Sequence, residues 1–401
     1  MEIKKEVLEL NEEVIKLRRD FHQHPELGFE EFRTSQTVME YLDKLGLKPK
    51  QITKTGVVAT LYGKRAGLTV MLRADMDALP VQEENEVSYK SVHDGIMHAC
   101  AHDGHTAMLL VAAKILCRHR DELAGNVKFV FEPNEENVAA LQMIEDGVLE
   151  DPPVDACFGI HLWSTLESGK MAITAGPVMA GMNHFDLVIK GKGGHTATPQ
   201  NSIDPILTAA NVIQAVQAIQ TREISVLQPT IIMFGQIEGG TASNIIPDKV
   251  TIKGTMRFLH ATSEGEEGPE HRFERIVANT CKAYRADYQL DFVSGHPTLV
   301  NDQALTEVVR SVARKVLEES CAAEKIVSYV SLAGEDFSEF AARVPGVFYF
   351  IGAGNRQKQT DFPHHHPRFN IDEDVLKLGV EMHVRTAMHY LNREHNMEER
   401  G

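Results

Sequence analysis

Four histidine and cysteine side chains lie within eight residues of this chain, in the segment His-Ala-Cys-Ala-His-Asp-Gly-His from His98 to His105. The 401-residue chain has 5 Cys and 19 His, so such a density is unusual. Thiolate and imidazole suit zinc and its transition-metal neighbours, whereas calcium and magnesium prefer oxygen ligands. Cys100 and His102 are two residues apart and can face one centre from a loop. The segment therefore predicts a transition-metal site.

Two further segments place carboxylates directly after apolar stretches that predict strands. Asp75 and Asp77 follow the stretch 68–73, and the pair Glu135 and Glu136 follows another such stretch. Open α/β sheets usually bind ligands at the carboxyl ends of their strands. Adjacent carboxylates point in different directions, so one can bind a metal while the other acts as a general base. Taken alone, each segment could also be a charged turn.

Two more segments offer histidine ligands. His161 ends an apolar stretch beside Trp163, the only tryptophan of the chain. His364, His365 and His366 lie between two prolines, and such a rigid loop could aim one imidazole at a metal. A lone histidine is more often structural than a ligand. With candidate ligands already present upstream, these histidines become candidates for the same centre.

A glycine-rich segment, Gly191-Lys-Gly-Gly-His-Thr-Ala-Thr-Pro199, presents one more histidine, His195. It lacks the GxxxxGK[ST] spacing of a phosphate-binding loop. Asn244 and Arg257 follow it in the chain. An asparagine and an arginine at strand ends could clamp the carboxylate of a substrate.

Charge and composition narrow the partners and the compartment. The net charge of -16 repels phosphate backbones, so no nucleic-acid partner is expected. No apolar stretch approaches the ~20 residues that span a bilayer, and the first residues lack the apolar run of a signal peptide, so no membrane partner is expected. The cysteines are odd in number and irregularly spaced, which fits a reducing cytoplasm. They are Cys100, Cys117, Cys157, Cys281 and Cys321.

The elements that must position these residues follow from the apolar periodicity. Strands and helices alternate over most of the chain, which favours an α/β layer structure. Helices are predicted at 3–20, 34–46, 105–118, 137–147, 303–319 and 372–393, and strands at 56–62, 68–73, 126–132 and 347–352.

The middle of the chain has a different order of elements, β-α-β-β-α-β, which is typical of split βαβ units. Its strands are predicted at 185–191, 229–238, 249–258 and 287–293, and its helices at 203–221 and 270–286. A chain of 401 residues is long for one core, so two domains are expected. We predict a discontinuous domain of residues 1–178 plus 294–401, with residues 179–293 as an inserted domain.

Taken together and in this order, the motifs resemble the metal-dependent aminoacylase and carboxypeptidase family. The nearest branch contains hippurate hydrolase, N-acyl-L-amino-acid amidohydrolases and indole-acetyl-amino-acid hydrolases. The resemblance runs from Arg18-Arg-Asp-Phe-His-Gln-His-Pro-Glu-Leu-Gly-Phe to His366-Pro-Arg-Phe-Asn. It implies a mixed-sheet α/β catalytic domain of the metallopeptidase type, with an inserted two-layer α+β lid and dimerisation domain. It also implies a homodimer or a higher homo-oligomer.

The resemblance assigns five ligands to a centre of two divalent transition-metal ions. They are Cys100, His102, Glu136, His161 and His365. His365 is chosen among its neighbours because the family places this ligand two residues before the proline. Zinc, manganese, cobalt and nickel all fit mixed cysteine, histidine and glutamate sites.

The resemblance also assigns the remaining roles. Glu135 matches the general base that deprotonates the metal-activated water, and Asp77 matches the carboxylate that orients a ligand. His195 matches the lid histidine that stabilises the oxyanion, often in the site of the partner subunit. Asn244 and Arg257 match lid residues near the carboxylate of the substrate.

Three departures from the family pattern surround these residues. Ala101 stands where relatives commonly have glycine between the first two ligands. Residues 137–140, Asn-Val-Ala-Ala, replace a run of glycines, and Thr196 and Thr198 replace small apolar residues. The ligands are retained but the walls around them are bulkier, so the substrate need not be that of the relatives.

The implied reaction is hydrolysis of the amide bond of N-acyl amino acids or small peptide-like conjugates. Two alternatives remain at this stage. In one, Cys100 is the nucleophile of a thiol hydrolase, although the loop has more histidines than a Cys–His pair needs. In the other, the chain is a catalytically silent metal-binding or scaffold protein, which would have no need of the base Glu135.

Overall fold

The computed structural model describes residues 2–260, 267–318 and 324–392, so Cys321 and the ends of the predicted helices at 319 and 393 lie outside the described residues. The chain divides into two compact units. Unit 1 comprises residues 1–178, 299–330 and 335–401, and unit 2 comprises residues 179–298 and 331–334. The predicted boundary at 293/294 falls inside a strand that ends at His296, and unit 2 extends to Thr298.

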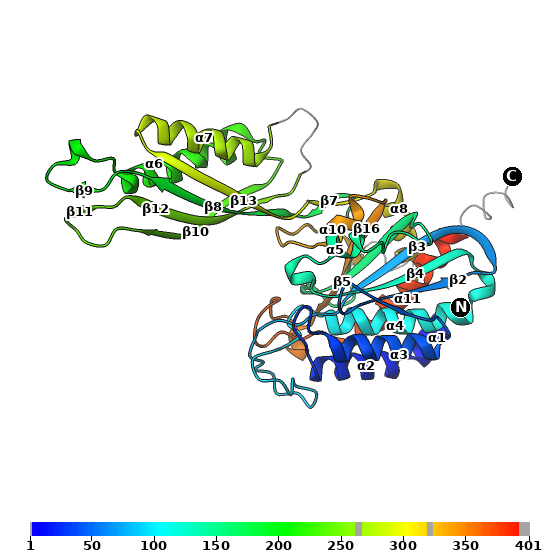
Figure 1. Ribbon diagram of the computed structural model, residues 1–401. Coiled ribbons are helices and arrows are strands. Elements are labelled where there is room, and N and C mark those ends of the chain that lie inside the picture. Colours follow the sequence, from blue (N-terminus) through cyan, green and yellow to red (C-terminus); the bar gives the residue numbers. More distant parts are fainter. Residues whose placement is uncertain (1, 261–266, 319–323, 393–401) are drawn as a thin grey trace. The chain divides into compact units, whose positions relative to one another are not determined.

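Unit 1 is built on an eight-stranded mixed sheet in the order β1-β2-β4-β3-β5-β16-β6-β15 (Figure 1). Its strands are β1 (Lys50–Ile52), β2 (Gly56–Tyr62), β3 (Arg65–Asp75), β4 (Ala124–Glu132), β5 (Ala156–Glu167), β6 (Met171–Ala172), β15 (Ile326–Val327) and β16 (Gly346–Gly354). Strand β3 runs parallel to β4 and β5, and β5 runs parallel to β16. Their carboxyl ends therefore meet at one edge, where a site is expected.

The helices of unit 1 gather mainly on one side of this sheet. They are α1 (Glu2–Glu9), α2 (Asn11–Gln23), α3 (Phe32–Lys44), α4 (His102–Arg118), α5 (Ala140–Glu145), α8 (Gln303–Val316), α10 (Phe337–Ala341) and α11 (Leu376–Leu391). Helix α4 is buried on nearly all sides and contacts β3, α2 and α11, and its middle, residues 107–113, is apolar throughout, as is usual for a buried helix. Helices α5 and α10 pack together away from α1–α4 (Figure 1).

Short elements complete unit 1. They are the 3₁₀ turns η1 (Arg120–Glu122), η2 (Glu135–Asn137), η5 (Arg356–Lys358) and η6 (Glu373–Val375), and the strand pair β7 (Gly176–Met179) and β14 (Leu299–Asn301).

Two predicted helices of unit 1 are interrupted. The helix predicted at 3–20 is two helices, because Leu10 between them has φ -98° and ψ 7°. Of the helix predicted at 137–147, only α5 forms, at residues 140–145. Val138 has a left-handed backbone, with φ 64°, and this separates α5 from the turn η2. A valine does not predict a left-handed backbone, because glycine adopts this conformation far more readily.

Unit 2 is a two-layer α+β structure. Its antiparallel sheet has the order β10-β12-β8-β13, and α6 and α7 pack on each other and on its apolar face. There the ring of Phe273 of α7 lies 4.6 Å from that of Phe185 of β8. The elements are β8 (Gly181–Lys190), β9 (Gly194–His195), η3 (Pro199–Asn201), α6 (Pro205–Ala218), the π-turn η4 (Ile219–Glu223), β10 (Thr230–Gly239), β11 (Ile245–Ile246), β12 (Lys249–Phe258), α7 (Pro269–Ala283) and β13 (Asp287–His296). The predicted fold class, a mixed-sheet α/β domain with an α+β insertion, is confirmed.

The lengths and hydropathies of the helices bear on membrane insertion. Within the described ranges, none is both long enough and apolar enough to cross a bilayer.

Candidate metal centre

The five predicted ligands all lie in unit 1, four of them in loops, in a turn or at a helix start, and one, His161, in the middle of a strand. Cys100 precedes α4 and His102 is its first residue, while Glu136 lies in the turn η2 that follows β4. His161 lies in β5, and His365 lies in the loop before η6. The fold therefore delivers ligands from four segments that are far apart in the sequence.

The ligand atoms of these residues form overlapping groups. Sγ of Cys100 lies 3.6 Å from Nε2 of His161, and Oε1 of Glu136 lies 3.1 Å from Nε2 of His365. Three groups of ligand atoms each lie within 4.8 Å of one another. They are those of Cys100, His161 and His364, then Cys100, Glu136 and His365, and then His102, Glu135 and Glu136. Cys100 and Glu136 thus link neighbouring groups, and the structure brings all five predicted ligands together.

Hydrogen bonds turn the Nε2 atoms of two histidines toward the centre. Nδ1 of His161 donates to the carbonyl of Leu162 at 2.9 Å, which leaves Nε2 as an acceptor facing Cys100. Nδ1 of His102 donates to the backbone carbonyl of Asp77 at 2.9 Å and to its carboxylate at 3.1 Å. Such a carboxylate–histidine contact fixes the tautomer and the ring orientation of a metal ligand. Burial lowers the pKa of His161 well below its usual value, so its ring is neutral.

Two buried atoms of the centre have no hydrogen-bond partner among the described residues. They are Nε2 of His102 and Oε1 of Glu136, which lies 3.1 Å from Nε2 of His365 but outside hydrogen-bonding geometry. A buried polar atom without a partner costs about 1–3 kcal/mol, and native proteins rarely leave one. A cation bound by thiolate, imidazole and carboxylate would satisfy both atoms, so the residues present fit a divalent transition metal.

A buried arginine, which the sequence analysis did not single out, supports the acidic side of the site. Arg73 donates to Glu132, to Asp75 at 2.6 Å and to Asp336 at 3.0 Å, and lies 3.0 Å from Glu335. In the register of β3 and β4, Asp75 stands opposite Glu132, and only this pairing brings both carboxylates to one guanidinium. Burial raises the pKa of Glu132 to about 7 and raises those of Glu335 and Asp336, whereas the neighbouring histidines and Arg73 hold the pKa of Asp75 well below its usual value.

His105 has a supporting position beside this network. Its Nδ1 donates to Asp75 at 2.6 Å, and its Nε2 accepts the backbone N–H of Leu162 at 2.8 Å. Both ring nitrogens are therefore used. His105 holds Asp75 and the backbone of β5 at Leu162, and neither nitrogen is left for a metal.

The buried carboxylate of Glu135 faces the centre from the turn η2. Its Oε2 lies 3.9 Å from Nε2 of His102. Burial and the negative charges of Glu335 and Glu136 raise the pKa of Glu135 well above its usual value. A carboxylate made more basic in this way suits a general base at neutral pH.

His364 of the loop 364–366 lies beside the centre, within 4.8 Å of the ligand atoms of Cys100 and His161, and His98 of the opening segment is also buried. His364 donates from Nε2 to the carbonyl of Leu162 at 3.1 Å, and its ring lies 4.3 Å from that of Trp163. His98 is buried, and neither of its ring nitrogens has a hydrogen-bond partner in the described part of the chain.

The three predicted residues of unit 2 fall into two places. His195 and Asn244 line a hollow of about 590 Å³. Nδ1 of His195 accepts the N–H of Ala197 at 3.0 Å, so Nε2 carries the proton and can donate. Arg257 lies near the far end of β12 and donates to the carbonyl of Leu332 at 2.9 Å. Within unit 2, the structure brings His195 and Asn244 together but not Arg257.

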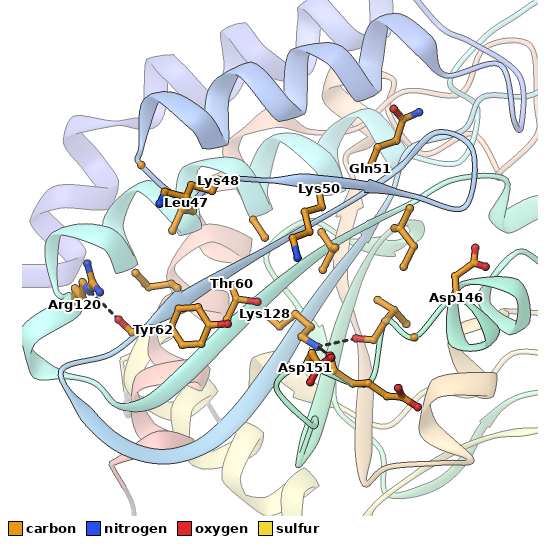
Figure 2. A pocket seen from close by; sticks show the side chains of 18 residues that line it. Leu47, Lys48, Lys50, Gln51, Thr60, Tyr62, Arg120, Lys128, Asp146 and Asp151 are labelled. Carbon is orange, nitrogen blue, oxygen red and sulfur yellow. Dashed lines mark hydrogen bonds between the residues drawn. The ribbon is translucent and has the colours of Figure 1, made fainter.

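A separate hollow of about 710 Å³ lies beside β1 and β2 of unit 1 (Figure 2). Lys50 and Asp146 both line it, so its charge is mixed. The buried ammonium group of Lys128 donates to the carbonyls of Val148 and Pro152, both at 2.9 Å, and to that of Glu150. All three of its N–H groups are used, and no histidine or cysteine lines the hollow. It offers nothing comparable to the metal centre.

The chain is similar to known proteins along nearly its whole length. The sequence model of peptidase family M20/M25/M40 matches residues 71–389. The chain belongs to this family. Thermostable carboxypeptidase 1 of Saccharolobus solfataricus is 38% identical over 397 residues, which cover 98% of each chain. IAA-amino acid hydrolase ILR1-like 4 of Arabidopsis thaliana is 40% identical over 385 residues, which cover 94% of this chain and 86% of the relative.

A solved structure of the family agrees with this fold. The Bacillus subtilis YXEP protein, a dinuclear metal-binding peptidase of the M20 family, superposes with a TM-score of 0.81 at 30% identity. The superposition covers 96% of this chain and 99% of that one. The resemblance drawn from the motifs is confirmed, and the M20 protein described here is an enzyme that hydrolyses amide bonds with divalent metal ions. This reading is favoured over a thiol hydrolase and over a silent metal-binding protein.

Proposed function

We propose that this M20 protein binds two divalent metal ions through Cys100, His102, Glu136, His161 and His365, and uses Glu135 as the general base of amide hydrolysis. The observation that carries the proposal is the set of overlapping ligand groups, in which Cys100 and Glu136 each belong to more than one group. Shared ligands of this kind suit two ions held close together. The buried ring nitrogen Nε2 of His102, which lacks a partner among the described residues, supports the same assignment.

The substrate that we propose is an N-acyl amino acid or a small peptide-like conjugate. One relative is named a carboxypeptidase and another an IAA-amino acid hydrolase. The bond common to these two names is an amide whose nitrogen belongs to an amino acid. We therefore propose a substrate with an amide bond to the nitrogen of an amino acid. We do not specify its acyl group, because residues 137–140 differ from the glycine run of relatives.

The chain's own residues perform the proton transfers of the proposed reaction. Bound divalent ions would polarise the acyl carbonyl and lower the pKa of water at the site. Glu135 takes a proton from the attacking water and delivers it to the nitrogen of the leaving amine, so that the C–N bond breaks as a neutral amine departs. Asp77 holds His102 in the tautomer that presents Nε2.

Residues of unit 2 complete the proposal. His195, whose Nε2 can donate, is proposed to stabilise the negative charge that develops on the carbonyl oxygen, a role worth about 2.7–4 kcal/mol in other hydrolases. Asn244 and Arg257 are proposed to bind the carboxylate of the substrate. These roles follow the resemblance residue by residue.

Zinc, manganese, cobalt and nickel remain the proposed metals, because the site mixes one thiolate with imidazoles and a carboxylate. The thiol of Cys100 must stay reduced to act as a ligand. Cys117, Cys157 and Cys281 are free thiols as well. A reducing compartment such as the cytoplasm is therefore proposed.

We also propose a homodimer that forms through unit 2. Strand β10 is an edge strand of the four-stranded sheet, and its Met233 and Ile237 are 59% and 58% exposed. Ile206 and Leu207 of α6 are exposed as well. Exposed edge strands with apolar side chains are ready to pair with another chain, and a second copy of this chain would give a symmetric contact. Light scattering that finds only monomers would refute the dimer.

The variant Glu135→Gln tests the catalytic assignment. The amide keeps the size of the side chain but cannot take up a proton, so turnover of N-acyl amino acids should fall by at least about 100-fold. Elemental analysis should find the metal content of the wild type, because Glu135 is not one of the five ligands. Glu145→Gln, an exposed change of the same kind, is the control and should keep wild-type turnover. Full activity of Glu135→Gln would refute the mechanism.

A further inference from the structure

A segment that the proposed function leaves without a role runs close to the catalytic turn. We call residues 26–31, Glu-Leu-Gly-Phe-Glu-Glu, the brace. It begins within the amino-terminal motif that carried the family resemblance. The carboxylate of Glu26 accepts the backbone N–H groups of Arg33 at 2.9 Å and Thr34 at 2.8 Å, in the first turn of α3. The brace is therefore anchored to a helix of unit 1.

The brace contacts the loop that carries Asp77. The carbonyl of Glu26 accepts the backbone N–H of Ala78 at 2.8 Å, and Leu27 forms a parallel β-bridge with Ala78. Ala78 directly follows Asp77, the residue that orients His102. The backbone on one side of the metal centre is thus fixed to the brace.

The brace also contacts the turn that carries Glu135. The buried carboxylate of Glu31 accepts the backbone N–H of Asn134 at 2.8 Å with one oxygen and the hydroxyl of Thr55 at 2.6 Å with the other. Gly28 lies against the side chain of Asn134, and a Cβ atom on residue 28 would lie 2.7 Å from Cγ of Asn134. No real Cβ contact is that short, so a side chain at position 28 would displace Asn134, the residue before Glu135.

The turn needs such external contacts because its backbone is strained. Asn134 has φ 52° and Val138 has φ 64°, so left-handed residues precede and follow the pair Glu135 and Glu136. Residues other than glycine that are held there cost about 1–3 kcal/mol each, and they persist only where the surroundings enforce them. On the far side of the turn, the carboxylate of Asp336 accepts the backbone N–H of Ala140 at 2.9 Å. The turn is held from both ends.

The burial of the Glu31 carboxylate is not explained by a contribution to the stability of the fold. Glu31 is fully buried, and no cation pairs with it in the described ranges of the chain. Burying a carboxylate away from water without a cation is unfavourable. The contacts it makes instead fix the position of the backbone beside the proposed general base.

We propose that Gly28 and Glu31 are positioning residues of the hydrolytic reaction, which fix the carboxylate of Glu135 through Asn134. This inference rests on the proposed role of Glu135. The brace ties the turn of Glu135 and the loop of Asp77 to one rigid segment, and so sets the distance between the base and the ligands. Gly28 provides the close approach and Glu31 provides the hydrogen bond.

The first test is Gly28→Ala in the metal-loaded, full-length protein. The methyl group forces Asn134 to move, and a shift of about 1 Å in a catalytic group can cost about 100-fold in rate. We expect kcat to fall about 10- to 100-fold, with KM within about threefold of wild type and with unchanged metal content. A loss of folded protein would lower the amount of active enzyme but would not change kcat per metal-loaded, folded chain.

A rescue experiment makes the test specific. Asn134→Gly removes the side chain that the new methyl group would strike, and glycine adopts the left-handed backbone of this position readily. In the Asn134→Gly background, Gly28→Ala should cost less than about threefold in kcat. Contacting residues are expected to show such non-additivity. An equal loss in both backgrounds, or no loss in the wild-type background, overturns the proposal.

The hydrogen bond is tested by paired changes at Glu31. Glu31→Gln keeps an oxygen for Asn134, while Glu31→Leu removes every acceptor, so kcat should fall much further for leucine than for glutamine. Equal kcat for the two overturns the role of Glu31. The failure of the proposed function can be told apart from the failure of this inference. If Glu135→Gln is active, the assignment of Glu135 as the general base is wrong. If Glu135→Gln is inactive but Gly28→Ala is fully active, only the positioning role of the brace is refuted.

Discussion

Replacing Asp77 by asparagine should weaken one metal-binding step and spare the other. One carboxylate oxygen of Asp77 accepts Nδ1–H of His102 at 3.1 Å, and the other accepts the backbone N–H of Glu136 at 3.2 Å. An amide has one acceptor, so its NH₂ group must face one of these donors. The loss of one hydrogen bond to a charged group is worth about 1.5–3 kcal/mol, or about 10- to 100-fold in affinity. The backbone carbonyl of Asp77 still accepts Nδ1–H of His102 at 2.9 Å, so we expect a loss of affinity at the lower end of this range.

The two binding steps can be followed separately. Trp163 is the only tryptophan, and its ring lies 5.1 Å from the ring of His161, so cobalt or nickel bound at His161 should quench its fluorescence. Competition with a chromophoric chelator measures both steps. We expect Asp77→Asn to weaken the step that does not quench Trp163 about 10- to 100-fold and to leave the quenching step within about threefold. The exposed change Asp94→Asn is the control. Equal weakening of both steps, or no weakening, would refute the role of Asp77.

Two further predictions concern buried charges away from the ligands. Burial lowers the pKa of His22, but its contacts with Asp103 at 2.8 Å and Glu83 at 3.1 Å bring it above 6.5. The stabilisation from protonated His22 is complete below pH 6.5 and is lost as the pH rises through the raised pKa. The difference in unfolding free energy between wild type and His22→Gln should therefore shrink at alkaline pH. A difference that stays constant with pH would contradict this prediction. Arg73→Met should cost about 3–5 kcal/mol in urea unfolding, because it leaves buried carboxylates without their cation. A cost below about 1 kcal/mol would show that these carboxylates are neutral.

Local patterns in the sequence predicted most elements, and the failures have local causes. Strand β12 has the predicted bounds 249–258, because apolar and polar residues alternate along it. Helix α4 begins at His102, before the predicted start at 105, because Ala101 in the left-handed region ends the preceding loop. The helix predicted at 137–147 failed at Val138 for the same kind of reason. Periodicity reports which side chains are buried, but it does not report a single residue whose backbone is forced into an unfavourable region by its surroundings.

The chemistry of the proposed centre could be predicted from the types of its side chains. The thiol, imidazole and carboxylate side chains, and the local spacing of Cys100 and His102, already indicated a transition-metal hydrolase. The tertiary structure alone brought His161 and His365 to these residues, placed the unforeseen Arg73 among its carboxylates, and set Gly28 and Glu31 against Asn134. The physical reason is that a ligand's chemical type belongs to its own side chain, whereas its distance to other ligands depends on strand register and on backbone contacts between segments far apart in the chain.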